Sequence, residues 1–314
     1  MRTAAVVGAG IGGLAAAIAL RNRGWDVTVL ERWPQIVDLG TAIGLWPDAQ
    51  RALGRLGVGD QIQAVGVPYR TAHVRTPKGR RIAPLPLERI ERSGGAPVLM
   101  VPRTTLIRTL ANALPAKTIH TGITVDRPTD LPHDLIVAAD GYRSTIRTAV
   151  APQTRTRYLG FVAIRGVVDG EFGPYGEVWG RGILVGVTPV ERGRTNFYVA
   201  LRAPQHTRPT LDDLRERLAH YPEPIPTVLG LATDVLRHDV HDLAPALRTY
   251  VHRNVALLGD AAHAMAPSLG QGACQALIDA DCLATNGLEN YDELRRRPTQ
   301  RLARASRLLS RIQT

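Results

Sequence analysis

A glycine-rich segment close to the N-terminus places the strongest constraint on how this chain can fold. Residues 8–13 read Gly-Ala-Gly-Ile-Gly-Gly and fit the pattern G-x-G-x-x-G. A short apolar run, residues 3–7, precedes the glycines, and an alanine- and leucine-rich run, residues 14–23, follows them. Runs of these lengths predict a buried parallel strand and a helix that ends before Gly24. The segment therefore predicts a strand–turn–helix unit of the kind that binds dinucleotides.

Each glycine of this pattern has a separate physical role. Gly8 permits the tight turn, Gly10 lets the backbone approach a pyrophosphate, and Gly13 lets the helix pack closely on the strand. The helix N-terminus offers free N–H groups and the positive end of its dipole to the phosphates. A second strand is predicted over residues 26–30, and Glu31 at its tip can accept a hydrogen bond from a ribose hydroxyl. The pattern fits FAD and NAD equally well, and a glycine turn in an unrelated α/β fold is the alternative.

A second segment, residues 134–147, also joins a predicted strand to a polar turn and a helix. The apolar strand leads into Asp140 and Gly141, and the helix is predicted to begin near Ser144. This order places a carboxylate and a flexible turn at the carboxyl edge of a sheet, where cofactors bind in α/β folds. A turn that only caps a helix explains the same residues equally well.

The third segment follows a predicted buried strand over residues 254–258. Gly259 and Asp260 come next, and a loop containing Pro267 leads to Gly270-Gln271-Gly272 at the start of another helix. Asp260 is a candidate for binding polyol hydroxyls, and the helix dipole can stabilise a developing negative charge. Because three separated segments each fit part of one site, the sequence predicts a flavoprotein that binds FAD non-covalently.

The middle of the chain shows a different pattern from its two ends. Between residues 158 and 201, alternating runs broken by glycines predict an antiparallel sheet. Helices are predicted over residues 45–56, 103–114 and 210–220. The predicted fold class is α/β, a Rossmann-like FAD-binding domain with an inserted antiparallel β-sheet substrate domain. The predicted FAD-binding domain comprises residues 1–67, 100–153 and 251–314, and the substrate domain comprises residues 68–99 and 154–250.

The chain resembles the FAD-dependent aromatic hydroxylases, the single-component monooxygenases of the para-hydroxybenzoate hydroxylase type. The matching pieces are GAGIGG with Glu31-Arg32, GLWPDAQRALGRLG, VPRTTLIRTL, and the Asp-Gly and Gly-Asp segments, in order to about Asp281. The resemblance implies that Val125 belongs to the adenine-side wall and that Pro267 lies beside the flavin, with the Gly270–Gly272 amides at its N1 and C2 carbonyl edge. The residues that it implies for FAD contacts are Gly8, Gly10, Gly13, Glu31, Arg32, Arg103, Asp140, Gly141, Gly259, Asp260 and Gln271.

The same resemblance implies an enzyme that uses NAD(P)H and O2 to hydroxylate an aromatic or polyketide-like small molecule through a flavin C4a-hydroperoxide. The cofactors are then FAD and NAD(P)H, and the lack of a second G-x-G-x-x-G pattern agrees with transient docking of NAD(P)H. Arg165, Arg181 and Tyr198 lie on the middle strands and are candidates for contact with the substrate. Another FAD oxidoreductase on this scaffold (an oxidase, a dehydrogenase or a reductase) and a flavin-binding accessory protein without turnover remain alternatives.

Composition restricts the remaining possibilities. The formal net charge is +11, but the arginines are scattered without an aromatic and basic strip, so no nucleic-acid partner is predicted. No apolar run of about 18 residues suggests a membrane span, and no signal-peptide pattern precedes the first strand. With only two cysteines, Cys274 and Cys282, neither a disulfide framework nor a metal site is expected. We predict a cytoplasmic monomer or homodimer.

Two further features have simple interpretations. His263 follows the Gly-Asp segment, and packing near the flavin loop is a better interpretation than a role as catalytic base. Four arginines near the C-terminus (residues 301, 304, 307 and 311) are expected to form a solvated helix face. Relative to the family pattern, the link between Ala113 and Leu135 and the connection after Cys282 are both short.

Overall fold

The computed structural model describes residues 1–36 and 40–313. One layer is a sheet with the strand order β15-β16-β9-β1-β2-β8, in which β15 is antiparallel to β16 and the other pairs are parallel. Its strands are β1 (Thr3–Val7), β2 (Asp26–Glu31), β8 (Ile119–Thr121), β9 (Leu135–Ala138), β15 (Val251–His252) and β16 (Val255–Leu257). The central strand β1 is buried on both faces, as its short apolar run predicts.

The first helix begins earlier than expected. α1 (Ile11–Arg21) starts directly after Gly10, so Gly12 and Gly13 already belong to its first turn. A Cβ atom on Gly13 would lie 1.9 Å from the carbonyl oxygen of Gly8, because the helix packs tightly against the end of the strand. The helix ends at Arg21, and Gly24 adopts a positive φ of 78° in the turn that follows. The predicted strand–turn–helix unit is present, with its helix three residues longer at the N-terminus.

The second large sheet has the order β14-β10-β13-β12-β11-β5-β6. Its strands are β5 (His73–Arg75), β6 (Arg81–Pro84), β10 (Arg155–Asp169), β11 (Gly176–Gly180), β12 (Ile183–Glu191), β13 (Arg194–Arg202) and β14 (Leu236–Ala244). The strands from β10 to β13 are antiparallel, as the glycine-broken pattern predicts, whereas β11 pairs in parallel with β5. A small third sheet joins β3 (Ala42–Leu45), β7 (Val98–Pro102) and β4 (Val67–Tyr69). The division of the chain into two domains remains a proposal.

The longer helices lie around and between these sheets. Apart from α1 they are α2 (Pro47–Arg55), α3 (Gly59–Val65), α4 (Leu87–Gly94), α5 (Arg103–Asn112), α6 (Thr145–Val150), α7 (Leu211–Leu218), α8 (Ile225–Leu231), α9 (Asp260–His263) and α10 (Gly272–Gln313). The helix expected over residues 45–56 begins at Pro47, because Leu45 ends β3 and proline favours the first helical position. Residues 210–220 form α7, which Thr210 caps through a reciprocal hydrogen-bond pair with Asp213.

The antiparallel sheet has two different faces. Alternate residues Phe197, Val199 and Leu201 of β13 pack against α7 and α8 in one hydrophobic core. The residues between them, Asn196, Tyr198 and Ala200, point to the opposite face and line a cavity. Because side chains alternate along a strand, a single register provides an apolar core on one side and a polar wall on the other.

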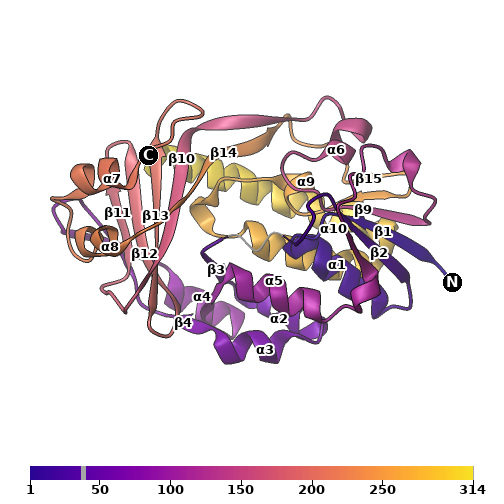
Figure 1. Cartoon of the computed structure of the whole chain (residues 1–314), viewed down its shortest axis with the longest axis horizontal. Helices are drawn as coiled ribbons and strands as arrows, with labels where there is room; N and C mark the ends of the chain where they lie inside the picture. Colours follow the sequence, from indigo (N-terminus) through magenta and orange to yellow (C-terminus); the bar gives the residue numbers. More distant parts are fainter. Residues whose placement is uncertain (37–39, 314) are drawn as a thin grey trace.

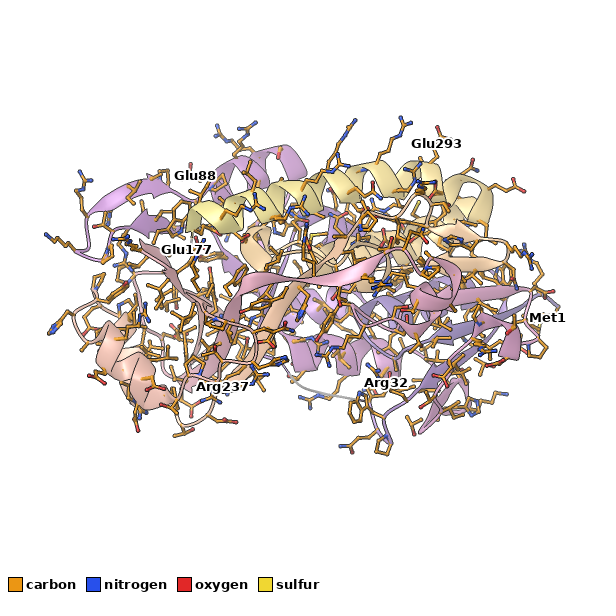
Figure 2. All side chains as sticks on the ribbon, turned by 90° about the horizontal axis from the view of Figure 1, so that it is seen from above. Met1, Arg32, Glu88, Glu177, Arg237 and Glu293 are labelled. Atoms are coloured by element: carbon orange, nitrogen blue, oxygen red, sulfur yellow. The ribbon has the colours of Figure 1, made fainter. Side chains whose placement is uncertain are left out.

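Helix α10 connects the two large sheets (Figure 1, yellow). It starts at the end of the Gly-Asp loop and runs along the molecule until its C-terminal end lies near Glu177 of the antiparallel sheet (Figure 2). Tyr291 donates a hydrogen bond to the Leu257 carbonyl oxygen at 2.9 Å, which fastens the helix to β16. Gly287 has non-helical backbone angles (φ 69°, ψ 176°), so α10 consists of two helical stretches joined at a kink, as the sequence suggested. In residues 1–36 and 40–313, no helix is both long and apolar enough to cross a membrane.

Candidate functional site

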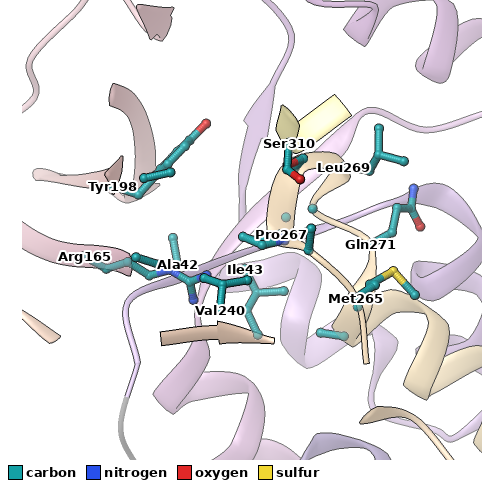
Figure 3. Close-up of a pocket in the computed structure, with 18 of the residues that line it drawn as sticks. Ala42, Ile43, Arg165, Tyr198, Val240, Met265, Pro267, Leu269, Gln271 and Ser310 are labelled. Atoms are coloured by element: carbon teal, nitrogen blue, oxygen red, sulfur yellow. The ribbon is translucent and has the colours of Figure 1, made fainter. Parts of the chain in front are cut away.

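A cavity of about 870 Å³ lies between the parallel sheet and the antiparallel sheet. One part of its wall comes from the glycine turn, the Asp-Gly segment and the Gly-Asp loop, all at the carboxyl ends of parallel strands. The other part comes from the inner face of the antiparallel sheet and the last turn of α10. Figure 3 shows Arg165 and Tyr198 on one side and the loop from Met265 to Gln271 on the other. All three segments singled out in the sequence therefore meet at one cavity.

The three glycines of the first turn have different surroundings. Gly8 has a φ of 103°, and a Cβ atom on it would lie 2.5 Å from the Ala139 carbonyl oxygen, so this position needs glycine. Gly10 lines the cavity, and a Cβ atom there would meet nothing within 4 Å. Only Gly10 therefore has the open surface expected of a pyrophosphate cradle. Gly8 and Gly13 do not line the cavity, and both are tightly packed where strand, turn and helix meet. Their contact with a pyrophosphate remains a prediction.

The Glu31 carboxylate holds the glycine turn in place. It accepts a hydrogen bond from the Ala9 N–H at 2.7 Å and another from the Trp33 N–H at 3.0 Å. Glu31 is buried beside the turn and does not line the cavity. Arg32 is exposed, and its guanidinium lies over the Trp33 ring at 5.8 Å. The ribose role of Glu31 and the contact assigned to Arg32 remain predictions.

Asp140 has the capping role that the sequence left open. Its Oδ2 atom accepts hydrogen bonds from the backbone N–H groups of Thr145 at 2.9 Å and Ile146 at 3.3 Å, at the start of α6. Its other oxygen, Oδ1, is buried and has no hydrogen-bond partner among the described residues. Gly141 has a φ of 81° and lines the cavity. Asp140 can therefore cap the helix and still offer an acceptor to a further group.

Arg147 ties the Asp-Gly segment to the Gly-Asp loop, and the sequence did not reveal it. Its side chain is only 2% exposed. The guanidinium donates to the Tyr142 carbonyl oxygen at 2.7 Å and to the Ala261 carbonyl oxygen at 3.2 Å. Burial lowers the pKa of Arg147, while the carboxylates of Asp140 and Asp260 act in the opposite direction. Nothing in the local pattern separates this arginine from the many exposed ones.

The Gly-Asp loop presents its polar groups to the cavity. Asp260 is open to the cavity interior. Burial of its carboxyl group by the surrounding protein raises the pKa of Asp260, whereas the charges of His263, Arg103 and Arg147 lower it. Further along the loop, Gly270 takes the left-handed conformation with a φ of 62°, and Gly272 begins α10. The remaining loop residues on the cavity wall include Pro267 and Gln271 (Figure 3).

A buried network of charged side chains is hydrogen-bonded to this loop. The Asp279 carboxylate lies 2.6 Å from His263 Nε2, accepts a hydrogen bond from Arg295 Nε at 2.6 Å, and accepts the Gly259 N–H at 3.1 Å. Burial alone would raise the pKa of Asp279, but the charges and hydrogen bonds of His263 and Arg295 hold it below its usual range. The packing interpretation of His263 is therefore confirmed. Sequence reasoning missed Asp279 and Arg295, because the two lie 16 residues apart on α10 and no short motif contains both.

Arg103 and Val125 have different surroundings. Arg103 begins α5 and lines the cavity, and its backbone N–H donates to the Thr41 carbonyl oxygen at 2.9 Å. Val125 is buried in the core and does not line the cavity; its carbonyl oxygen accepts a hydrogen bond from Thr145 Oγ1 at 3.0 Å. A part for Val125 in the adenine-side wall therefore remains a prediction.

The three substrate candidates do not lie together. Arg165 and Tyr198 occupy facing positions on β10 and β13 and line the cavity. Arg181 is exposed in the turn between β11 and β12 and does not line the cavity. Strand β11 ends at Gly180, directly before this residue, and a substrate contact by Arg181 remains a prediction. Glu177 and Trp179 of β11 lie on the cavity wall instead, and sequence reasoning missed both.

Comparison with known proteins agrees with this geometry. A family model described as an FAD binding domain matches residues 1–132 and 121–292. The chain is 34% identical to the 3-amino-4-hydroxybenzoate 2-monooxygenase of Streptomyces cremeus over 341 aligned residues, covering 98% of this chain and 86% of that one. It is 32% identical to the aurachin C monooxygenase/isomerase of Stigmatella aurantiaca, covering 90% and 79% of the two chains.

A solved structure is similar over the same extent. The crystal structure of HpxO from Klebsiella pneumoniae, complexed with FAD and uric acid, superposes with a TM-score of 0.88 at 28% identity. The match covers 99% of this chain and 88% of that one. The predicted fold class, the FAD cofactor and the family resemblance are confirmed. This chain belongs to the FAD-binding monooxygenases of the para-hydroxybenzoate hydroxylase type.

Proposed function

We propose that this chain is a single-component monooxygenase that uses NAD(P)H and O2 to hydroxylate an electron-rich aromatic or polyketide-like small molecule. The observation that carries the proposal is one continuous cavity with two unlike ends. One end has the residues expected to hold FAD, and the other is a partly polar, partly apolar sheet face large enough for a small ring system. The substrates named for relatives, 3-amino-4-hydroxybenzoate and uric acid, are small rings that would suit such a space.

The residues present fit FAD on two structural grounds. The open space above Gly10 would be filled by a Cβ atom in any other residue, and it adjoins the N-terminus of α1, where backbone N–H groups favour phosphates. The unpartnered Oδ1 of Asp140 is an acceptor that lacks a donor among the described residues. We further propose that Asp260 accepts hydrogen bonds from the ribityl hydroxyls and that Arg103 contacts the cofactor between its pyrophosphate and its ring, since both residues line the cavity.

When bound, FAD would accept a hydride from NAD(P)H and activate O2, chemistry that belongs to the cofactor. The chain's own contribution is position, charge and exclusion of water. The amides at Gly270–Gly272 begin a long helix, so the positive end of its dipole lies beside the site and favours negative charge there. Pro267 adds an apolar surface without a backbone N–H donor. The sheet face and the last turn of α10, with Ser310 and Gln313, close the far side of the cavity.

The test is turnover with labelled oxygen. Purified protein loaded with FAD is given NADH or NADPH and a panel of phenols under ¹⁸O₂, and we expect a phenol to accelerate nicotinamide oxidation and to appear as a product carrying ¹⁸O. Stoichiometric hydrogen peroxide with every tightly bound ligand, and no labelled product, would instead identify an oxidase. If neither nicotinamide reduces the bound flavin, the chain has no such turnover and the proposal fails.

A further inference from the structure

The last turns of α10 carry positive charge without any negative charge between them. Residues 294–314 contain seven arginines and no aspartate or glutamate. Three of these arginines pair with carboxylates elsewhere in the chain: Arg295, Arg296 and Arg307. The other four are exposed and form no ion pair within the part of the chain that the structure describes: Arg297, Arg301, Arg304 and Arg311. These four charges therefore face solvent.

Large apolar side chains lie on the same outward face. Leu294, Leu308 and Ile312 are 47%, 62% and 66% exposed. They recur with the four exposed arginines at intervals of three or four positions, so all seven follow one side of the helix, over about 27 Å. In Figure 2 this part of α10 runs near the upper edge of the view, between Glu293 and Glu177. We call this face the cationic stripe, and its members are Leu294, Arg297, Arg301, Arg304, Leu308, Arg311 and Ile312.

The buried side of the same turns is polar. All four buried positions between residues 299 and 313 carry polar side chains: Thr299, Ser306, Ser310 and Gln313. A surface helix ordinarily buries its large apolar residues and exposes its polar ones. Here Leu308 and Ile312 point outward although the other side of the helix packs against the protein. Exposed apolar side chains grouped in this way mark a surface that contacts a partner.

The composition of the stripe decides between possible partners. A second copy docked through the same face would bring its own four arginines against four more, and like charges repel. A nucleic acid would match the arginines with phosphates, but Leu308 and Ile312 would then face a charged backbone, and the stripe has no aromatic side chain to stack on bases. An anionic bilayer supplies both chemistries, because phosphates lie at the headgroup level and hydrocarbon lies beneath them.

We propose that the cationic stripe docks this protein, as a peripheral contact, on a membrane surface rich in anionic lipids. The helix would lie in the plane of the interface, with Leu308 and Ile312 between the headgroups and the guanidinium groups at the phosphates. The inner side of the same turns lines the cavity with Ser310 and Gln313. Docking would therefore hold this end of the cavity about 10 Å from the lipid, the diameter of one helix. The proposal does not depend on the reaction proposed above.

Vesicle binding is the direct test. The FAD-loaded protein is mixed with vesicles of phosphatidylcholine alone, or of equal parts of phosphatidylcholine and phosphatidylglycerol, and the bound fraction is measured by flotation. We expect at least about 10-fold tighter binding to the anionic vesicles, because each basic residue near such a surface adds several-fold to the affinity. Added salt should weaken this binding. No binding to the anionic vesicles, or equal binding to both kinds, would overturn the proposal.

Paired variants show whether the arginines of the stripe are responsible. Arg301→Gln combined with Arg304→Gln should weaken binding to the anionic vesicles about 10- to 30-fold. The matched control is Arg192→Gln combined with Arg217→Gln, two exposed arginines in the β12–β13 turn and on α7. It removes the same net charge away from the stripe and should weaken binding by less than about 3-fold. Equal weakening by both pairs would show a general effect of net charge and refute the assignment to the stripe.

The apolar residues distinguish membrane docking from binding to another macromolecule. Leu308→Gln combined with Ile312→Gln should weaken vesicle binding about 10-fold or more, because hydrocarbon contact is lost. The control Leu231→Gln, whose leucine is 50% exposed at the end of α8, should bind as the parent does. FAD content and circular dichroism should stay as in the parent for every variant. The proposal is wrong if the Leu308 and Ile312 variant binds vesicles unchanged, if duplex DNA binds more tightly than the vesicles, or if this variant instead converts a dimer into a monomer.

Discussion

The buried network under the Gly-Asp loop makes a strong prediction about stability. Replacing Asp279 by Asn removes the carboxylate that faces His263 and Arg295, whose side chains are 0% and 10% exposed. Arg295 is then a buried cation that has lost its counter-ion. Breaking a buried pair in this way typically costs about 3–5 kcal/mol, a large share of the roughly 5–15 kcal/mol that stabilises a domain.

The matched control is Asp281→Asn, two residues further along the same helix. Asp281 pairs with Arg55, whose side chain is 55% exposed, at 2.8 Å. Surface pairs contribute about 0–1 kcal/mol. In chains of 150–250 residues each kcal/mol shifts Tm by about 2–4 °C, and somewhat less in a longer one. We therefore expect Asp279→Asn to lower Tm by at least about 5 °C, and Asp281→Asn by about 2 °C or less.

The pH dependence provides a second check on the same variant. The folded-state pKa of Asp279 lies below its usual range, so its contribution to stability is fully present above the unfolded value of about 3.9 and is lost as pH falls through the folded pKa. Urea unfolding of the parent and of Asp279→Asn should thus differ fully at pH 7 and progressively less below about pH 4. Equal losses in both aspartate variants, or no loss in Asp279→Asn, would show that the network does not stabilise the loop.

Three other predictions concern the cavity. Asp260→Ala should retain less FAD, because a charged hydrogen-bond acceptor contributes about 1.5–3 kcal/mol to binding. If the ratio of flavin absorbance to protein is unchanged, Asp260 does not belong to the cofactor site. Gly10→Val should lose FAD and keep the circular dichroism of the parent, and a yellow Gly10→Val protein would contradict the cofactor role of Gly10. Gly13→Ala should instead unfold at a lower temperature, because a Cβ atom at this position has no room. Gly186→Ala should displace the Tyr198 ring, because a Cβ atom at residue 186 would lie 2.0 Å from Cζ of Tyr198. We expect a cost of about 1–3 kcal/mol in urea unfolding, and a stability equal to that of the parent would contradict this close contact.

The sequence alone was sufficient for the FAD end of the cavity. The glycine turn, Asp140-Gly141 and Gly259-Asp260 each follow a strand and lead into or begin the next helix, so their order along the chain determines their place in space. Parallel strands bring their carboxyl ends to one edge of the sheet, and turns that follow those strands must meet there. A short local pattern therefore carries enough information to predict this part of the site.

The substrate end and the buried supports depended on the tertiary structure. Arg165, Tyr198 and Glu177 meet only because of the register of β10, β13, β12 and β11, and a shift of one residue would turn each side chain to the opposite face. Arg181, which looks like Arg165 in the sequence, lies in an exposed turn, because strand β11 ends one residue before it.

Local sequence patterns also fail to identify the buried arginines. The chain has 39 lysines and arginines, and the sequence around Arg147 and Arg295 does not distinguish them from the exposed ones. Their partners lie far away along the chain or on a buried face of α10: Arg147 binds the Ala261 carbonyl oxygen, 114 residues distant, and Arg295 binds Asp279. Local patterns determine which strands and turns form, because backbone geometry is local. Which charges are enclosed is decided only when distant segments pack together.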